Sequence, residues 1–198
     1  VLPNERGRRS GLVAPAYGDD PRRGKFLSHL GYYRAISDYM DINALTDLYT
    51  KGGWALYSNY RYALRYSFTG SVSANYKRLH QGEPGDPGRS EEESYSLNVR
   101  HNQEIDPATR LNVDFSFASN NSYVTTNDLN QALNQYITSN ALLSRSLDEY
   151  NSMSLSVSRQ HNLLTGNTDE TLPALSFHHS ATYPLRWGKQ SGDEESFS

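Results

Sequence analysis

Polar and apolar side chains alternate along much of this chain with a period of two, the pattern of β-strands whose two faces meet different surroundings. The stretch from residue 54 to residue 77 shows the alternation most clearly. Its apolar positions are Trp54, Leu56, Tyr60, Tyr62, Leu64, Phe68, Val72, Ala74 and Tyr76, and its polar positions include Asn59, Arg61, Arg65, Ser71, Ser73, Asn75 and Lys77. Residues 94–102, 110–117 and 152–158 repeat the pattern. The sequence therefore predicts an all-β, antiparallel fold.

The alternating stretch 54–76 is too long for a single strand, because it would extend about 75 Å at about 3.3 Å per residue. We expect a hairpin between Ala63 and Ser67. The same parity holds on both sides of it, so its loop should contain an odd number of residues or a bulge. A two-residue loop would reverse the parity.

Connections of different length separate the predicted strands. Residues 106–109 contain a well-placed proline and form a short turn, whereas residues 81–93 and 120–136 are long and polar. Residues 128–136 are expected to form a short helix inside their loop. We expect about eight or nine strands, with long loops at one end and short turns at the other, as in outer-membrane barrels.

Composition narrows the surroundings of these strands. Hydrophobic residues make up only 36% of the chain and mean hydropathy is −0.75, yet 12% of residues are aromatic and 15 are Tyr. The aromatic content argues against disorder. A polar face of Ser, Asn, Thr and Arg suits a wet lumen, and an apolar face that ends in Tyr and Trp suits membrane interfaces. A transmembrane β-barrel is favoured; a soluble β-sandwich that binds carbohydrate on Tyr and Trp remains the alternative.

Charge and candidate chemistry exclude several functions. The net charge of −3 gives no reason to expect a nucleic-acid partner, and there is no Cys for disulfides or thiolate chemistry. Adjacent His178 and His179 point to opposite faces of a strand, so no metal site or cofactor is predicted. No catalytic motif occurs, and we predict that the chain is not an enzyme. The acidic cluster of Glu83, Asp86 and residues 91–93 suits either a Ca²⁺ or Mg²⁺ site or a solvated loop.

Three ordered stretches carry a family resemblance. Residues 8–15 read Arg-Arg-Ser-Gly-Leu-Val-Ala-Pro, residues 31–41 contain Tyr-Tyr-x-x-Ile with a closing Asp, and residues 47–54 contain Tyr-x-Lys-x-Gly. Together they resemble the LPS-assembly protein LptD family, although Leu12 stands where that family usually has Phe. The resemblance covers residues 6–66; beyond it only the barrel-like alternation continues.

The resemblance implies an outer-membrane protein of a Gram-negative bacterium that inserts lipopolysaccharide (LPS) into the outer leaflet. The family combines a periplasmic β-jellyroll with a large barrel plugged by the lipoprotein LptE, and lipid leaves between the first and last strands. Implied partners are LPS, an LptE-like plug, periplasmic LPS-bridge proteins and membrane lipids. This chain would be the start of the barrel: a leading segment at 1–24, strands at 25–187 and a polar tail or loop at 188–198. Both of its ends look cut from a longer protein.

Two groups of residues are candidates for function on this interpretation. The gate and signature residues are Arg8, Arg9, Ser10, Gly11, Leu12 and Pro15, where Pro15 weakens strand pairing because it has no backbone N–H. The alternative is that Pro15 is an ordinary proline that ends a strand. The candidates for lining the lumen are Arg61, Arg65, Lys77 and Arg100. These cations either meet phosphorylated sugars or pair with carboxylates such as Asp114. A porin or receptor fragment remains a further alternative.

Overall fold

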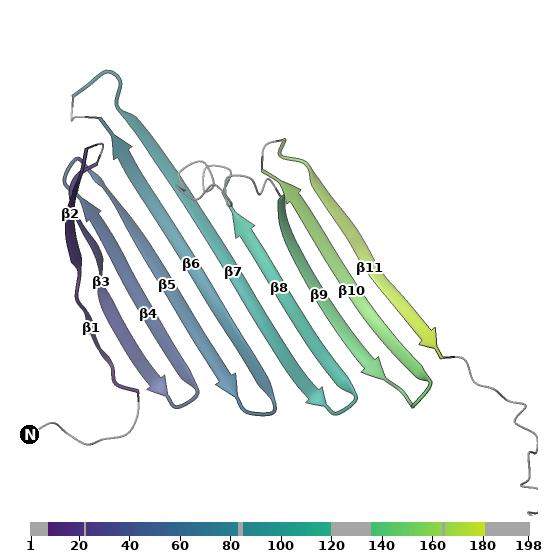
Figure 1. Cartoon of the computed structure of the whole chain (residues 1–198). Helices are drawn as coiled ribbons and strands as arrows, with labels where there is room; N and C mark the ends of the chain where they lie inside the picture. The colour runs from purple at the N-terminus through teal and green to yellow at the C-terminus, as the bar shows by residue number, and fades with distance from the viewer. Residues whose placement is uncertain (1–7, 22, 83–84, 120–135, 164, 181–198) are drawn as a thin grey trace, which may run out of the picture.

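The computed structural model describes residues 8–21, 23–82, 85–119, 136–163 and 165–180. Within these ranges the chain forms eleven β-strands in one antiparallel sheet (Figure 1). They are β1 (Gly11–Val13), β2 (Ala16–Asp20), β3 (Gly24–Ser37), β4 (Met40–Tyr49), β5 (Gly53–Leu64), β6 (Phe68–Gln81), β7 (Ser90–Asp106), β8 (Thr109–Ala118), β9 (Tyr136–Ser146), β10 (Asn151–Asn162) and β11 (Thr168–His179). From β3 onward each strand pairs with the next strand in sequence, and β1 and β2 both pair with β3.

The predicted number of eight or nine strands is wrong. The described residues contain eleven strands, and two of them, β1 and β2, lie in the leading segment before residue 24. They are three and five residues long, too short for period-two alternation to reveal them in the sequence. No helix in the described ranges is long and apolar enough to cross a membrane. The short helix expected at 128–136 lies almost wholly outside the described residues, and β9 begins at Tyr136.

The hairpin between β5 and β6 confirms the parity argument. Leu64 pairs with Phe68, which leaves the three residues 65–67 in the turn. Arg65 therefore lies in this turn and not on a strand face. The next residue, Tyr66, takes a left-handed conformation, with φ of 62°, where the chain reverses. The predicted short turn at 106–109 is also confirmed, since β7 ends at Asp106 and β8 begins at Thr109.

The connections at one end of the sheet are all short, whereas the other end has both short and long connections. Residues 38–39, 65–67, 107–108 and 147–150 join strands at one end, called here the turn end and drawn at the bottom of Figure 1. The two longest connections, 82–89 and 119–135, lie at the opposite end, called here the loop end. However, Glu91, Glu92 and Glu93 belong to β7 and not to a loop as predicted. Their segment pairs with β6, where Glu91 contacts Arg78 and His80.

The sheet has a polar face and an apolar face over most of its width. One continuous row of register partners crosses β4 to β10 and defines the polar face. In order, this row contains Asp41, Arg61, Ser71, Arg100, Asp114, Asn140 and Ser158. Tyr60, Val72, Val99 and Phe115 are successive partners on the apolar face. Because hairpins and register preserve parity between neighbours, the alternation within each strand becomes two continuous surfaces.

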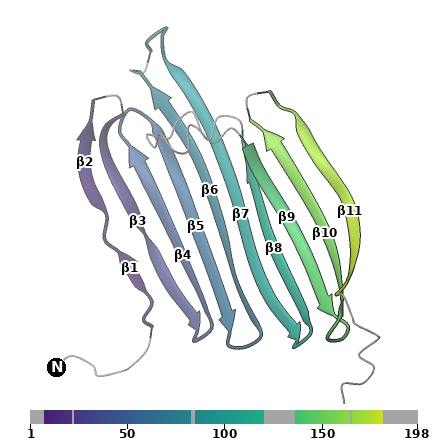
Figure 2. The same ribbon diagram turned by 45° about the vertical axis from the view of Figure 1, so that its right-hand side comes forward.

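The described residues form a single layer, as Figure 2 shows from a second direction. Large apolar side chains such as Leu56, Leu155 and Phe177 are 40–62% exposed, and no second sheet of the described residues covers them. A soluble β-sandwich buries such a face against another sheet. The sheet is open in the described residues, with β1 and β2 at one edge and β11 at the other. This architecture is that of part of a β-barrel wall.

Candidate functional site

The first edge of the sheet is one strand interrupted at Ala14 and Pro15. Val13 pairs with Gly31 and Ala16 pairs with Ser28, so β1 and β2 keep the same register on β3. Continuing that register places Pro15 opposite His29. Pro15 has no N–H to donate, which accounts for a break in the ladder at this position.

A bulge in β3 lies at the same level as this break. The register between β3 and β4 shifts between Leu27 and Leu30, and His29 has a φ of 59°. The His29 backbone N–H donates to Asp47 Oδ1 at 2.7 Å, and the Tyr57 hydroxyl donates to Asp47 Oδ2 at 3.1 Å. The buried Asp47 carboxylate thus replaces the ladder partner that the bulge removes. Irregularities in two neighbouring pairings therefore lie at the same level of the sheet.

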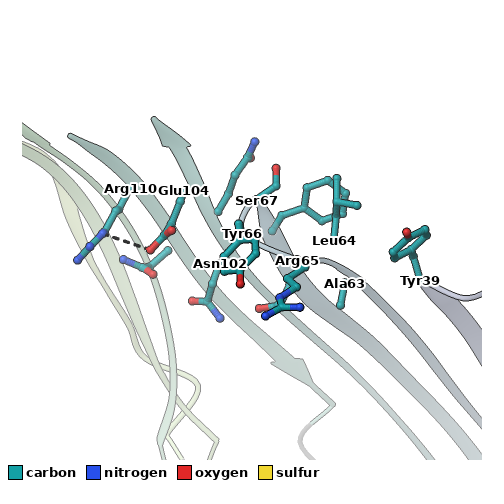
Figure 3. Close-up of a pocket in the computed structure, with 13 residues that line it drawn as sticks. Tyr39, Ala63, Leu64, Arg65, Tyr66, Ser67, Asn102, Glu104 and Arg110 are labelled. Carbon is teal, nitrogen blue, oxygen red and sulfur yellow. Dashed lines mark ion pairs between the residues drawn. The ribbon is translucent and has the colours of Figure 1, made fainter. Parts of the chain in front are cut away.

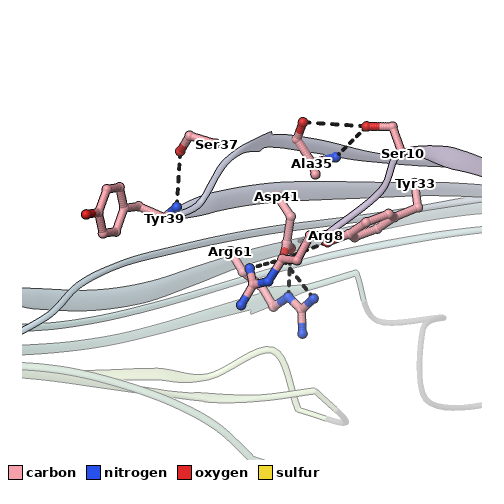
Figure 4. Close-up of polar contacts among 8 residues, drawn as sticks. All are labelled: Arg8, Ser10, Tyr33, Ala35, Ser37, Tyr39, Asp41 and Arg61. Atoms are coloured by element: carbon pink, nitrogen blue, oxygen red, sulfur yellow. Dashed lines mark hydrogen bonds and ion pairs between the residues drawn. The ribbon is translucent and has the colours of Figure 1, made fainter. Parts of the chain in front are cut away.

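The signature residues Arg8 and Ser10 bind to the next strands (Figure 4). The Arg8 guanidinium lies 2.7 Å from Asp41 Oδ2, and the Ala35 backbone N–H donates to Ser10 Oγ at 2.9 Å. Arg61 donates to both oxygens of Asp41, at 2.8 and 3.0 Å, and the Tyr33 hydroxyl donates at 3.2 Å. The Asp41 carboxylate is therefore enclosed by donors and is 1% exposed. These contacts fasten the segment before β1 to β3 and β4.

The other signature residues have more open surroundings. Leu12 is 83% exposed and pairs with Tyr32 on the apolar face. Arg9 is exposed, and a side chain added at Gly11 would meet no atom within 4 Å. Nothing in the structure explains why glycine stands at position 11.

Three of the four candidates for lining the lumen lie on strands, with their positions on the polar face. Arg61 pairs with Asp41, Arg100 lies 3.4 Å from Asp114, and the Lys77 ammonium lies 5.7 Å from the centre of the Tyr57 ring. Ser71 separates Arg61 from Arg100 in one row, whereas Lys77 lies nearer the loop end. The alternative of pairing with a carboxylate such as Asp114 thus describes both Arg61 and Arg100. Arg65, in the β5–β6 turn, lies 4.6 Å from the centre of the Tyr66 ring.

The acidic stretch at the loop end is matched by basic and hydroxyl groups on β6. Glu91 pairs with Arg78 and lies 3.6 Å from His80, and Glu93 accepts a 2.8 Å hydrogen bond from the Tyr76 hydroxyl. No group of three or more His, Asp or Glu residues suited to a metal ion occurs in the described part of the chain. Glu83, a further member of the predicted acidic cluster, lies outside the described residues.

Sequence reasoning named Arg61 and Pro15 as candidates but not Asp41, Asp47, Tyr33 or His29. Asp41 closes one of the matched motifs, yet nothing in the sequence pairs it with Arg8 or Arg61. His29 carries a weaker signal for a left-handed conformation than Gly or Asn would have given. The registers of β3, β4 and β5 bring these side chains together.

Comparison with known proteins gives a consistent result. A family model described as LptD protein matches residues 1–198. An LPS-assembly protein LptD from Actinobacillus pleuropneumoniae serotype 7 (strain AP76) is 30% identical over 119 residues, which cover 59% of this chain and 15% of that protein. Another from Bordetella avium (strain 197N) is 29% identical over 140 residues, covering 69% of this chain and 16% of that protein. The chain thus spans about one sixth of the length of these curated relatives.

Proposed function

The chain belongs to the LptD family, and on that premise we propose that it forms part of the barrel wall through which LPS reaches the outer leaflet. The family is a non-enzymatic transport component of the outer membrane of Gram-negative bacteria.

One observation carries the proposal: the sheet is a single layer with a polar row on one face and an apolar surface on the other. Aromatic contacts lie toward both ends of the apolar face. Trp54 and Tyr76, with ring centres 5.0 Å apart, lie toward the loop end, and Tyr62 and Phe68, 6.0 Å apart, lie toward the turn end. Such rims suit the two interfaces of a bilayer, and the polar face suits a water-filled lumen.

These faces give the two parts of an LPS molecule separate routes. The saccharide passes along the polar face, where Arg61 and Arg100 are exposed to hydrophilic groups and Lys77 is half-buried. The lipid leaves at the edge formed by β1 and β2, where Pro15 interrupts the ladder. A plug lipoprotein of the LptE type fills the remaining lumen, and periplasmic bridge proteins deliver LPS at the turn end. No cofactor is required.

The experiment replaces Pro15 in the full-length protein that contains this chain. P15A restores an N–H at the break and allows β1 and β2 to pair continuously with β3, so the edge should open less readily. Newly made LPS should reach the cell surface more slowly, as measured by labelling LPS from outside intact cells. P173A is the matched control, because Pro173 lies in β11, next to a register shift and away from the β1 edge. If LPS reached the cell surface equally fast in P15A and wild type, Pro15 would not be part of the gate.

A further inference from the structure

A groove of about 830 Å³ lies at the turn end of the polar face (Figure 3). Tyr39, Arg65, Tyr66, Asn102, Glu104 and Arg110 are among the residues that line it. A second groove of about 380 Å³ shares Tyr39 and Asn102 with the first and adds Arg8, Asp41, Arg61 and Arg100. The two are neighbouring parts of one concave surface across β4 to β8.

The β5–β6 turn presents a cation and an aromatic ring to this surface. Tyr66 is 81% exposed and has a φ of 62°, a conformation that a bulky side chain rarely adopts. Gly or Asn would form the same turn without that strain and without exposing a ring. Arg65 lies 4.6 Å from the centre of the Tyr66 ring, and its other described contacts include no carboxylate. Turn formation alone therefore does not explain Arg65 and Tyr66.

Positive charge exceeds negative charge on this surface. Among the described residues that line the two grooves, five are arginines: Arg8, Arg61, Arg65, Arg100 and Arg110. Three carboxylates neutralise them in part: Asp41 binds two, Asp114 lies 3.4 Å from Arg100, and Glu104 lies 3.6 Å from Arg110. Two positive charges remain in excess. Guanidinium groups suit phosphate and carboxylate oxygens, which they bind in pairs of parallel hydrogen bonds.

Amide and aromatic groups complete the surface. Asn102 and Asn112 are register partners on β7 and β8 and both line the larger groove, where their amides can donate to and accept from hydroxyl groups. Exposed Tyr39 and Tyr66 offer flat apolar faces of the kind that pack against a sugar ring. This surface suits an anionic sugar, because it combines excess guanidinium groups, paired amides and exposed rings.

We propose that this groove binds a phosphorylated or carboxylated sugar at the turn end of the polar face. The proposal rests on the proposed function and deepens it, by assigning the first contact of the saccharide to Arg65, Tyr66 and Arg110. Arg65 binds the anionic group, the two asparagines bind hydroxyl groups, and the tyrosines pack against the ring. An acidic segment of a partner protein is the competing occupant, and the experiment distinguishes it.

The experiment uses the full-length protein in cells, with a photo-crosslinking phenylalanine analogue in place of Tyr39. Irradiation should give an LPS adduct on gels. R65Q should reduce that adduct about tenfold, the effect of losing one charge-assisted contact. R34Q is the matched control and should leave it unchanged, because Arg34 lies near the same end but pairs with Ile42 on the apolar face. Heat-dependent gel migration checks that each variant is folded.

Two further measurements identify which chemical group of the sugar the groove recognises. Purified protein is irradiated with LPS and with LPS whose phosphates have been removed enzymatically, each with and without excess inorganic phosphate. Lower crosslinking to the dephosphorylated LPS supports recognition of a sugar phosphate. Crosslinking that is equal for both forms and insensitive to inorganic phosphate overturns the proposal.

Other outcomes separate this inference from the proposed function. An adduct with a protein instead of LPS overturns the inference, because the groove is then a protein interface. Loss of surface LPS in cells depleted of the full-length protein, together with no adduct at position 39, refutes the groove and leaves the transport function standing. Normal surface LPS in depleted cells would refute the proposed function itself.

Discussion

At the scale of single residues, the most constrained group is the Asp41 carboxylate. It is 1% exposed and accepts hydrogen bonds from Arg8, Arg61 and Tyr33, which come from three separate parts of the chain. Other charges on the polar face, such as Arg100 and Asp114, are exposed. Arg8 and Arg61 remain more than half exposed, so water screens their attraction to Asp41 in part. Asp41 thus links the segment before β1 to β4 and β5.

Replacing Asp41 by Asn should destabilise the barrel more than the same change at a paired but exposed carboxylate. D41N leaves two guanidinium groups without their common partner and should lower the free energy of unfolding by about 2 kcal/mol. D114N is the control, since Asp114 is 46% exposed, and its effect should be below about 1 kcal/mol. Urea unfolding of the full-length protein in detergent measures both. Equal losses in the two variants would contradict a special role for Asp41.

At the scale of elements, β3 is the strand on which the edge depends. It carries β1 and β2 on one side and β4 on the other, and it contains the bulge at His29. Just beyond that bulge, Gly31 pairs with both Val13 and Leu45. A Cβ atom at position 31 would overlap the carbonyl oxygen of Ala44 and lie 2.8 Å from the Leu45 Cα. Only glycine allows β3 and β4 to approach this closely.

Two glycines of the matched motifs should therefore respond differently to alanine. G31A forces backbone atoms apart and should lower the free energy of unfolding by about 2 kcal/mol or more. G11A should change it by less than about 0.5 kcal/mol, because nothing lies within 4 Å of the added atom. Urea unfolding compares them, and heat-dependent gel migration shows whether G31A still assembles. If both variants match wild type, the close approach of β3 to β4 is not required.

The β9–β10 turn should loosen in acid. Hydrogen bonds from the Asn151 side chain, and then from the Tyr150 and Asn151 backbone N–H groups, lower the pKa of Asp148 below its usual 3.8. The stabilisation by Asp148 is therefore complete above pH about 4 and is lost as the pH falls through the lower folded-state pKa. Amide hydrogen exchange at Tyr150 and Asn151, corrected for intrinsic rates, should accelerate at pH 3 relative to pH 6. D148N should abolish that pH dependence, and a persistent dependence in D148N would assign it to another group.

At the scale of the whole molecule, the sheet has two edges and an uncovered apolar face in the described residues. Edge strands with unpaired N–H and C=O groups promote association, and large exposed apolar surfaces do the same. In a complete barrel the remaining strands would pair with these edges and lipid would cover the apolar face. In the part of the chain that the structure describes, no further strand pairs with either edge and nothing covers the apolar face.

Expressed by itself, the chain should not form a soluble monomer. Size-exclusion chromatography without detergent should show aggregates, and detergent should reduce their size by covering the apolar face without pairing the edges. The full-length protein in detergent is the control and should migrate as a compact, heat-modifiable species. A monodisperse soluble monomer of residues 1–198 would contradict the barrel and favour a β-sandwich.

Sequence reasoning reached the fold by way of the alternation, and it located the β5–β6 turn between Ala63 and Ser67 because a single strand over residues 54–76 would be too long. It failed at β1 and β2, which are too short for a period to be visible, and at Glu91 to Glu93, whose charge suggested a loop. Those glutamates form a strand because Arg78, His80 and Tyr76 on β6 offer partners across the ladder. A local pattern does not report such partners.

By itself, the sequence determined that this protein has strands with one polar and one apolar face, because a period of two is a property of each strand alone. Only the tertiary structure decided which residues meet. The contacts of Arg8 and Arg61 with Asp41, the break at Pro15 opposite His29, and the groove beside Arg65 all depend on the register between strands. Hairpins and bulges set that register over separations such as the 33 residues between Arg8 and Asp41, and a shift of one residue would move strand side chains such as Arg61 to the other face.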